Sequence, residues 1–374
     1  MKKQIFLLLT FFCYLYSFSQ KFKGVIKNAE TNQPISQITI ISEDDTFFIT
    51  SNEKGEVVLS DSIFHKKLLI NDYEYELSEK VFSTAENFTW ELIPNSETLE
   101  EIIIFNDVRG YLEEIINNSI KSFSTNVALE SYYRENYFEN NEIASFAEGM
   151  VDFFIDKETK NVLQLAKQTR AENFAEVNDF NRNIMSSPKE VVEGSMRFKR
   201  ILNLIKDKKN YDIDVTAKQV GDKTIHTCYI SPKEKSKNRF LIKGYFTFND
   251  EKKLIYDTNY AFDEEKKKYN KPVNLIVGKI DVKDMAYKSK YIIKNSFYYP
   301  SYAKTTTELI ANSKAADVSN VKVHNQSYFY VLKAETNSSK PDITKTLNNE
   351  TLYSKGTIYK TEFWNDPEII NFTE

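Results

Sequence analysis

A histidine and a cysteine stand two residues apart in a stretch that alternates apolar and polar side chains. His226 and Cys228 belong to the run Thr224–Ile230. Because successive side chains of a strand point to opposite faces, the two share one face if this run is a strand. An imidazole beside a thiol is the pair that a cysteine nucleophile uses. The sequence identifies no third group to orient the histidine, so a buried structural thiol is the favoured interpretation and a hydrolase is an alternative.

Other groups suited to acid–base or metal chemistry are scattered. The three histidines are His65, His226 and His324, in different segments, and they show no metal-ligand spacing. Adjacent carboxylates such as Glu113 and Glu114 are more often a solvated face than an acid–base pair. The sequence motifs of serine hydrolases, zinc peptidases, P-loop proteins and dinucleotide-binding proteins do not occur. We therefore expect a protein that is not an enzyme and that holds no cofactor.

The composition indicates an ordered, aromatic-rich chain. The 374 residues include 9 Gly, 8 Pro, 2 Cys, 23 Tyr and 27 Phe. So few glycines and prolines exclude collagen-like and low-complexity disordered chains, and two cysteines exclude a disulfide scaffold. The formal net charge of −4 argues against a nucleic-acid partner.

The N-terminus has the pattern of an export signal. A basic start precedes an apolar run over residues 5–16, and small residues precede the bond between Ser19 and Gln20. This layout predicts a signal peptide over residues 1–19 that is cleaved between Ser19 and Gln20. The apolar run is too short for a membrane-spanning helix, which needs about 20 residues, and no later run is long enough. The sequence thus predicts an exported protein, in the periplasm or associated with the outer membrane, without a transmembrane helix in the mature chain.

Residues 20–95 are predicted to form a small all-β domain. Short β-branched and aromatic segments alternate with turn signals, among them Asn28–Pro34 and Asn52–Gly55. Regular short strands with such turns are typical of a sandwich. We expect a β-sandwich of the seven-stranded type.

The same residues resemble a known domain family. The carrying segments are Lys23–Lys27, Thr31–Ile35, Ile38–Ile41 and Thr50–Val57, which together look like the carboxypeptidase-regulatory-like domain. The resemblance implies a transthyretin-like sandwich at the front of an exported Bacteroidota protein, with neither zinc nor a peptidase site. The run Tyr132–Glu135 resembles a flavobacterial family of unknown activity that joins this domain to a larger β-rich domain.

Residues 96–125 are predicted to be a linker strand and a helix. The strand resembles the segment that follows the regulatory-like domain in outer-membrane receptors, where it acts as a partner strand; the residues concerned are Leu99, Glu101, Ile102, Ile103 and Ile104. The alternative is a strand that docks on the next domain. We favour this alternative because a receptor barrel needs several hundred more residues than follow. The helix, over Val108–Phe123, carries one apolar stripe.

Residues 126–374 are predicted to form a β-rich C-terminal domain. A capping box at Ser187–Glu190 begins a helix that runs to about Lys206, and strands dominate from Asn210 onward. Their order is similar to that of periplasmic lipoprotein-carrier half-barrels. The predicted fold class is mainly β (α+β overall), with the N-terminal sandwich followed by a larger antiparallel, half-barrel-like sheet and at least two packed helices.

The aromatic residues of two predicted strands suggest a site for an apolar ligand. Phe246, Phe248, Tyr256 and Tyr260 would line a curved sheet that can hold a lipid, although simple core filling is the favoured reading of them. The first hypothesis is therefore a non-catalytic envelope binding or assembly module for an envelope protein or another ligand. The alternative is a periplasmic carrier or binder of a lipid or apolar ligand, and the second alternative is a hydrolase.

Overall fold

The computed structural model describes most of the chain after the predicted signal peptide. The described residues are 21–43, 48–70, 72, 74–94, 101–102, 106–156, 162–174, 186–220, 223–276, 278–294, 297–314, 317–336, 338–341 and 350–355. The predicted cleavage site, Ser19 and Gln20, lies outside these residues. The chain divides into two compact units, of which the first comprises residues 1–95 with residues 364–374 and the second runs from Ser96 to Phe363.

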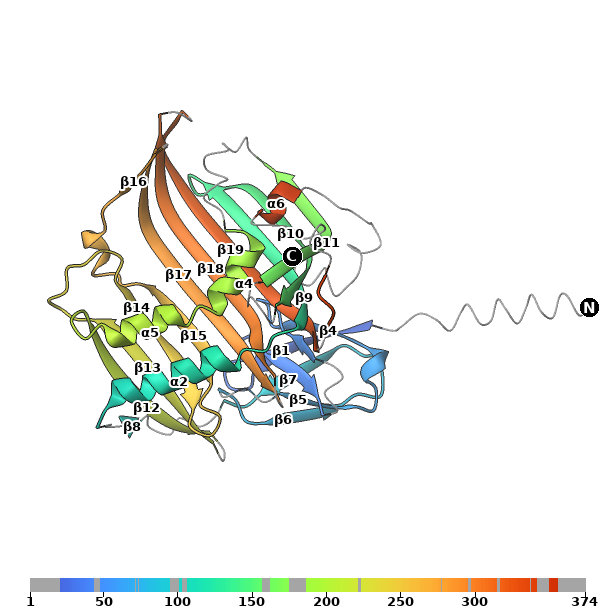
Figure 1. The fold of residues 1–374 in the computed structure, drawn as a ribbon. Coiled ribbons are helices and arrows are strands. Elements are labelled where there is room, and N and C mark those ends of the chain that lie inside the picture. The colour runs from blue at the N-terminus through green and yellow to red at the C-terminus, as the bar shows by residue number, and fades with distance from the viewer. Residues whose placement is uncertain are drawn as a thin grey trace, which may run out of the picture. The chain divides into compact units, whose positions relative to one another are not determined.

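The first unit contains two small sheets (Figure 1). One has the strand order β4-β1-β7 and the other β3-β2-β5-β6. The strands are β1 (Lys21–Asn28), β2 (Thr39–Ser42), β3 (Phe48–Thr50), β4 (Glu56–Ser60), β5 (Lys67–Ile70), β6 (Ser78–Val81) and β7 (Phe88–Leu92), with a 3₁₀ turn η1 (Asp61–Ile63). These seven strands confirm the predicted sandwich.

The core of the first unit explains its sequence pattern. Trp90, Phe22 and Leu68 are buried in one apolar cluster, and the Trp90 indole N–H donates to Ser78 Oγ at 2.8 Å, so its one polar group is satisfied. Gly55 has a φ of 73°, and a Cβ there would lie 2.7 Å from the carbonyl oxygen of Ile26. The turn before β4 therefore requires glycine.

The second unit is built on one 12-stranded antiparallel sheet. Its strand order is β11-β10-β9-β19-β18-β17-β15-β14-β13-β12-β8, and β16 pairs with β17 beside this path. The strands are β8 (Glu101–Ile102), β9 (Val127–Glu139), β10 (Glu142–Ile155), β11 (Val162–Asn173), β12 (Tyr211–Val220), β13 (Lys223–Pro232), β14 (Ile242–Asn249), β15 (Ile255–Phe262), β16 (Val273–Leu275), β17 (Gly278–Lys294), β18 (Phe297–Ser313) and β19 (Val318–Thr336).

Helices cover one face of this sheet (Figure 1). They are α2 (Val108–Ser122), α4 (Pro188–Ser195), α5 (Lys199–Lys206) and the short α6 (Leu352–Lys355), and a 3₁₀ turn η2 (Lys267–Tyr269) lies between β15 and β16. The Asp107 side chain accepts from Gly110 N at 3.1 Å to cap α2, and Ser187 and Glu190 form the predicted capping box of α4. The fold-class prediction of a mainly β chain with a large antiparallel sheet and packed helices is confirmed.

The single helix predicted from Ser187 to about Lys206 is two helices. α4 ends at Ser195 and α5 begins at Lys199. The hydroxyl groups of Tyr287 and Tyr291 on β17 donate to the carbonyls of Val191 and Ser195, at 2.9 and 2.6 Å. These bonds satisfy carbonyls near the helix end, and the break lets each half pack on its own part of the sheet.

Candidate functional site

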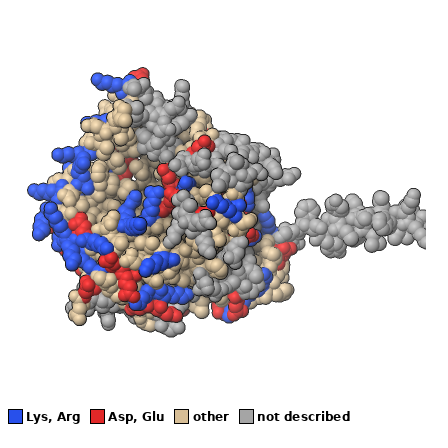
Figure 2. Space-filling view, viewed as in Figure 1, with Lys and Arg blue, Asp and Glu red and all other residues tan. Residues whose placement is uncertain are grey.

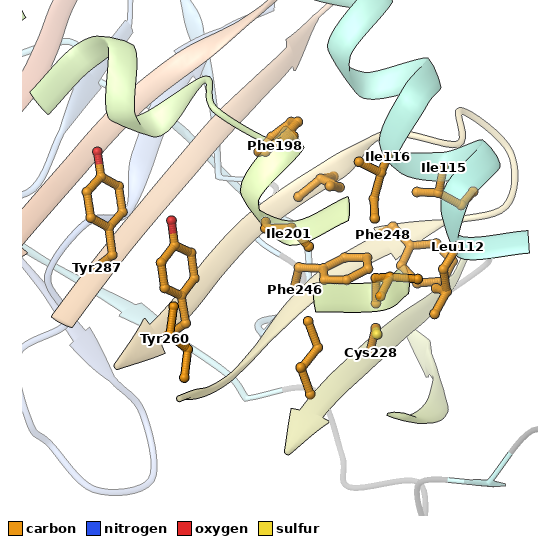
Figure 3. Packing of buried hydrophobic residues seen from close by; sticks show 14 of the residues in the cluster. Leu112, Ile115, Ile116, Phe198, Ile201, Cys228, Phe246, Phe248, Tyr260 and Tyr287 are labelled. Atoms are coloured by element: carbon orange, nitrogen blue, oxygen red, sulfur yellow. The ribbon is translucent and has the colours of Figure 1, made fainter. Parts of the chain in front are cut away.

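The helix-covered side of strands β12–β15 holds an aromatic and aliphatic core (Figure 3). Leu112, Ile115 and Ile116 on α2 face Phe246 and Phe248 on β14. α5 contributes Ile201 and Ile205, and Tyr260 and Tyr287 stack at a ring distance of 5.5 Å along the same face. The helices thus fill the place where an open half-barrel would present a free apolar surface.

Three of the four predicted ligand-lining residues lie in this core. Phe246, Phe248 and Tyr260 are 1%, 0% and 8% exposed. Tyr256 is half-buried outside the cluster. The pairing of β14 with β15 slips near Phe248, so that Ile255 lies opposite Phe248 and takes the inward position. Burial raises the pKa of the Tyr256 hydroxyl to about 12. Whether the other three contact a ligand stays a prediction.

A small cavity lies between α5 and the sheet. It is lined by Ile201, Leu204, Ile230, Ile242, Gly244, Tyr245, Phe246 and Tyr260, and its volume is about 10 Å³. That space holds about one water molecule. The closed form described here therefore has no room for an acyl chain, and a ligand can enter this place only if α5 moves.

His226 and Cys228 share one face of β13, as the alternation predicts, but they do not form a nucleophile pair. Cys228 is 0% exposed, and burial raises the pKa of its thiol well above the usual value. His226 stacks on Phe248, its Nε2 lies 2.8 Å from Asp250 Oδ2, and burial lowers its pKa. Asp250 is the orienting group that the sequence did not reveal, because the turn after β14 brings it back to β13.

The buried thiol should be inert in the folded protein. We expect a thiol reagent such as 5,5′-dithiobis(2-nitrobenzoic acid) to label Cys228 at least about a hundredfold more slowly in buffer than in denaturant, because only the thiolate reacts and burial disfavours it. A Ser319→Cys variant provides the control, since Ser319 is exposed and a thiol there should react at once. Rapid labelling of Cys228 in native protein would contradict this and revive the hydrolase hypothesis.

A buried ionic cluster lies on β9–β11. Glu148 is 0% exposed, its Oε1 accepts from Arg170 Nε at 2.7 Å, and its Oε2 lies 3.2 Å from an Arg134 nitrogen. The Tyr132 hydroxyl also donates to Oε2. The Tyr132, Arg134 and Arg170 side chains all bond to Glu148, so the role of the cluster in the described structure is to fix the pairing of the three strands.

A second buried carboxylate, Glu135, lies on the opposite face of β9. It is 0% exposed and its Oε1 accepts from the backbone N–H of Tyr353 on α6 at 2.7 Å. Burial is the largest effect on it and raises its pKa from 4.5 to about 7. A carboxyl group with this pKa is a candidate for pH-dependent behaviour.

The predicted partner strand is partly described. Glu101 and Ile102 form β8, which pairs antiparallel with Ala217 and Thr216 at the edge of the large sheet. This is the docked arrangement that the sequence analysis favours for these residues. Leu99, Ile103 and Ile104 lie outside the described residues, so a role in binding a partner stays a prediction.

Within the described part of the chain, no cluster of three or more His, Cys, Asp or Glu could hold a metal ion, and no helix is long and apolar enough to cross a membrane.

Comparison with known proteins finds weak structural matches. No family model and no curated protein matches the chain. Among solved structures, a DUF1329 family protein from Desulfovibrio piger matches with 8% identity and a TM-score of 0.28, over 64% of this chain and 98% of its own. A LolA superfamily protein from Nitrosomonas europaea matches with 6% identity and a TM-score of 0.22, over 62% and 95%. A structure of lipid–protein interactions in lipovitellin matches with 9% identity and a TM-score of 0.27, over 63% of this chain and only 28% of its own. Scores this low carry no argument about function.

Proposed function

We propose that the chain is an exported, non-catalytic protein of the bacterial envelope that binds an apolar ligand, a lipid or a similar molecule, between α5 and strands β13–β15. The observation that carries the proposal is the aromatic-floored cavity beneath α5. The buried thiol and the scattered histidines argue against an enzyme, and the predicted signal peptide supports an exported protein.

The attachment of α5 is light enough for the helix to move. Only Ile201 and Ile205 on it are fully buried, while Leu202 and Leu204 pack half-buried against the same core. Phe198, the residue before it, is buried but makes no side-chain cap. Two polar contacts also hold the helix: an ion pair between Lys206 and Glu113, at 2.5 Å, and a hydrogen bond from Arg109 to the carbonyl of Ile205. α5 is therefore a short helix that is held at its N-terminal end by the buried Phe198 ring, which packs on Phe123 and Tyr291, and at its C-terminal end by these two bonds.

The energies of opening and of ligand burial are comparable. Exposing two isoleucine side chains costs about 1.5–3 kcal/mol each, so lifting α5, which also carries the half-buried Leu202 and Leu204, costs at least about 3–6 kcal/mol. Each buried methylene of a ligand contributes about 0.8 kcal/mol. At least roughly four to eight methylenes are therefore needed to offset the cost, which a fatty-acyl chain supplies and a small polar molecule does not.

Two neighbouring leucines of α5 allow a matched test. Leu204 lines the cavity and Leu202 does not, although both are half-buried on the same helix. We expect Leu204→Glu to weaken the binding of a fluorescent long-chain fatty acid at least tenfold, because a carboxylate beside the cavity must be desolvated, whereas Leu202→Glu should bind within about twofold of the unaltered protein.

The same protein, purified from envelope extracts, should carry a lipid in native mass spectrometry. Equal losses in the two variants would contradict the placement of the site. The absence of both co-purified lipid and fatty-acid binding would contradict the function itself.

We also propose that the first unit belongs to the carboxypeptidase-regulatory-like domains. The support is its seven-stranded sandwich, together with Gly55 at the positive φ that the resembling segment requires. Such a unit would serve as a non-catalytic accessory to the larger sheet.

A further inference from the structure

A basic cleft lies where the loops after β13 and β15 meet. It has a volume of about 800 Å³ and is lined by Lys237, Asn238, Arg239, Phe240, Lys268, Tyr269 and Lys271. Figure 2 shows lysine and arginine side chains gathered on the edge of the molecule where these loops lie. Four of the seven lining residues are cationic and none is acidic, in a chain of net charge −4.

The charges of the cleft are not neutralised by carboxylates. Among the described residues, Lys237, Arg239, Lys268 and Lys271 make no ion pair with a carboxylate. Their neighbour Lys267 behaves differently, since it pairs with Glu264 at 2.5 Å and with Asp284 at 3.0 Å. Cations that no carboxylate neutralises and that line a cleft from both loops are suited to an anionic surface.

The cleft is held in shape by a bond between its two loops. The backbone N–H of Phe240 donates to Asn270 Oδ1 at 2.7 Å, and Phe240 has a φ of 58°. A positive φ is rare for a bulky residue and persists only where its surroundings enforce it. The arrangement presents aromatic rings beside the cations, with Arg239 lying 5.7 Å from the Phe240 ring and Lys268 5.4 Å from the Tyr269 ring.

An exposed apolar strand continues directly from this cleft. β16 carries Val273 and Leu275, which are 37% and 44% exposed, and Ile276 in the following turn is fully exposed. β16 pairs with β17 beside the main path of the sheet, so these side chains contribute nothing to the core. Lys271 precedes the strand and Lys279 follows it, and both are exposed.

We propose that β16 and the basic cleft dock the protein on an anionic lipid surface. Leu275 and Ile276 would enter the boundary between headgroups and acyl chains, and the lysine and arginine side chains would meet lipid phosphates. An apolar tip flanked by cations, with aromatic rings close by, matches the layering of such an interface. The inference is independent of the cavity beneath α5 and stands whether or not that cavity holds a ligand.

Vesicle co-sedimentation tests the docking surface. We expect the purified protein to bind vesicles of phosphatidylglycerol and phosphatidylethanolamine at least tenfold more tightly than vesicles of phosphatidylcholine alone, and to lose most of this preference in 0.5 M salt, which screens exposed charges. No binding to anionic vesicles at low salt would overturn the proposal and leave the apolar strand as a surface for a protein partner.

Matched variants separate the two contributions. Lys237→Glu with Lys268→Glu should weaken binding at least tenfold, whereas Lys121→Glu with Lys252→Glu, an equal charge change at exposed sites outside the cleft, should not. Ile276→Ser should weaken binding about tenfold, but Leu77→Ser, at a 60% exposed leucine of the first unit, should leave it unchanged. Equal effects of a test variant and its control would overturn the proposal.

Insertion has its own signature. In an Ile276→Trp variant, the new tryptophan should be quenched by brominated acyl chains, in excess of any quenching in the unaltered protein. Binding without this extra quenching would overturn the insertion of the tip.

Discussion

Replacing Glu148 with alanine should lower the free energy of unfolding of the second unit by about 3 kcal/mol or more. Removing one partner of a buried ion pair typically costs about 3–5 kcal/mol, because the remaining charge stays desolvated. Arg134 and Arg170 keep 18% and 30% of their side chains exposed, so we place the effect at the lower end of this range. The hydrogen bond from the Tyr132 hydroxyl is lost as well.

The measurement can distinguish the two units. The tryptophans of the chain are Trp90 and Trp364, and the second unit, Ser96–Phe363, has none. Denaturation followed by near-ultraviolet circular dichroism of tyrosine should shift, whereas the fluorescence of Trp90 in the first unit should not. Glu172→Ala, at an exposed glutamate on β11, should change stability by less than about 0.5 kcal/mol. An equal shift for Glu148→Ala and Glu172→Ala would show that the cluster contributes nothing.

Replacing Glu135 with glutamine should remove a pH dependence of stability. The pKa of this carboxyl group is about 7 in the folded protein against 4.5 ordinarily, so between these values the folded chain keeps a proton that the unfolded chain releases. Stability is therefore fully present below about pH 4.5 and falls as the pH rises to 7. The difference corresponds to at most about 3 kcal/mol.

Glutamine keeps an acceptor for the Tyr353 N–H and carries no charge. The variant should consequently be more stable than the unaltered protein at pH 8, by up to about 3 kcal/mol, and similar to it at pH 4. Urea unfolding of the second unit at both pH values provides the test, with Glu172→Gln as the control. A Glu135→Gln variant that is less stable at pH 8, or that keeps the full pH dependence, would disprove the assignment.

Local sequence signals predicted much of the fold. The apolar stripe of α2, the capping box of α4 and the alternation of β13 each follow from the identity of near neighbours, and all three are present. The sequence does not predict the break between α4 and α5, because the break depends on hydroxyl groups of Tyr287 and Tyr291 on β17, each 96 residues further along the chain than its partner.

The candidate sites were harder to foresee. In the sequence, the run Tyr132–Glu135 points only to a resemblance, yet its alternation sends Arg134 to one face and Glu135 to the other, where the two side chains meet different partners. The exposure of the apolar residues of β16 is not predictable for another reason. Hydrophobicity along a short run is the same whether the strand is buried or exposed, so nothing in the residues themselves marks Ile276 as a surface group.

The pairing of β9 with β19 bears on how the chain reaches its native state. Val127, near the start of the sheet, lies opposite Thr336, at the end of its last long strand. Among the described strands, β9–β11 join β12–β18 through β19. Both parts of the sheet therefore keep an unpaired edge strand until β19 has been synthesised. Such high contact order slows folding and leaves unpaired edges exposed to aggregation. A chain that is exported from its N-terminus would therefore complete this sheet in a single late step. Until that step, its unpaired edge strands would need protection from aggregation.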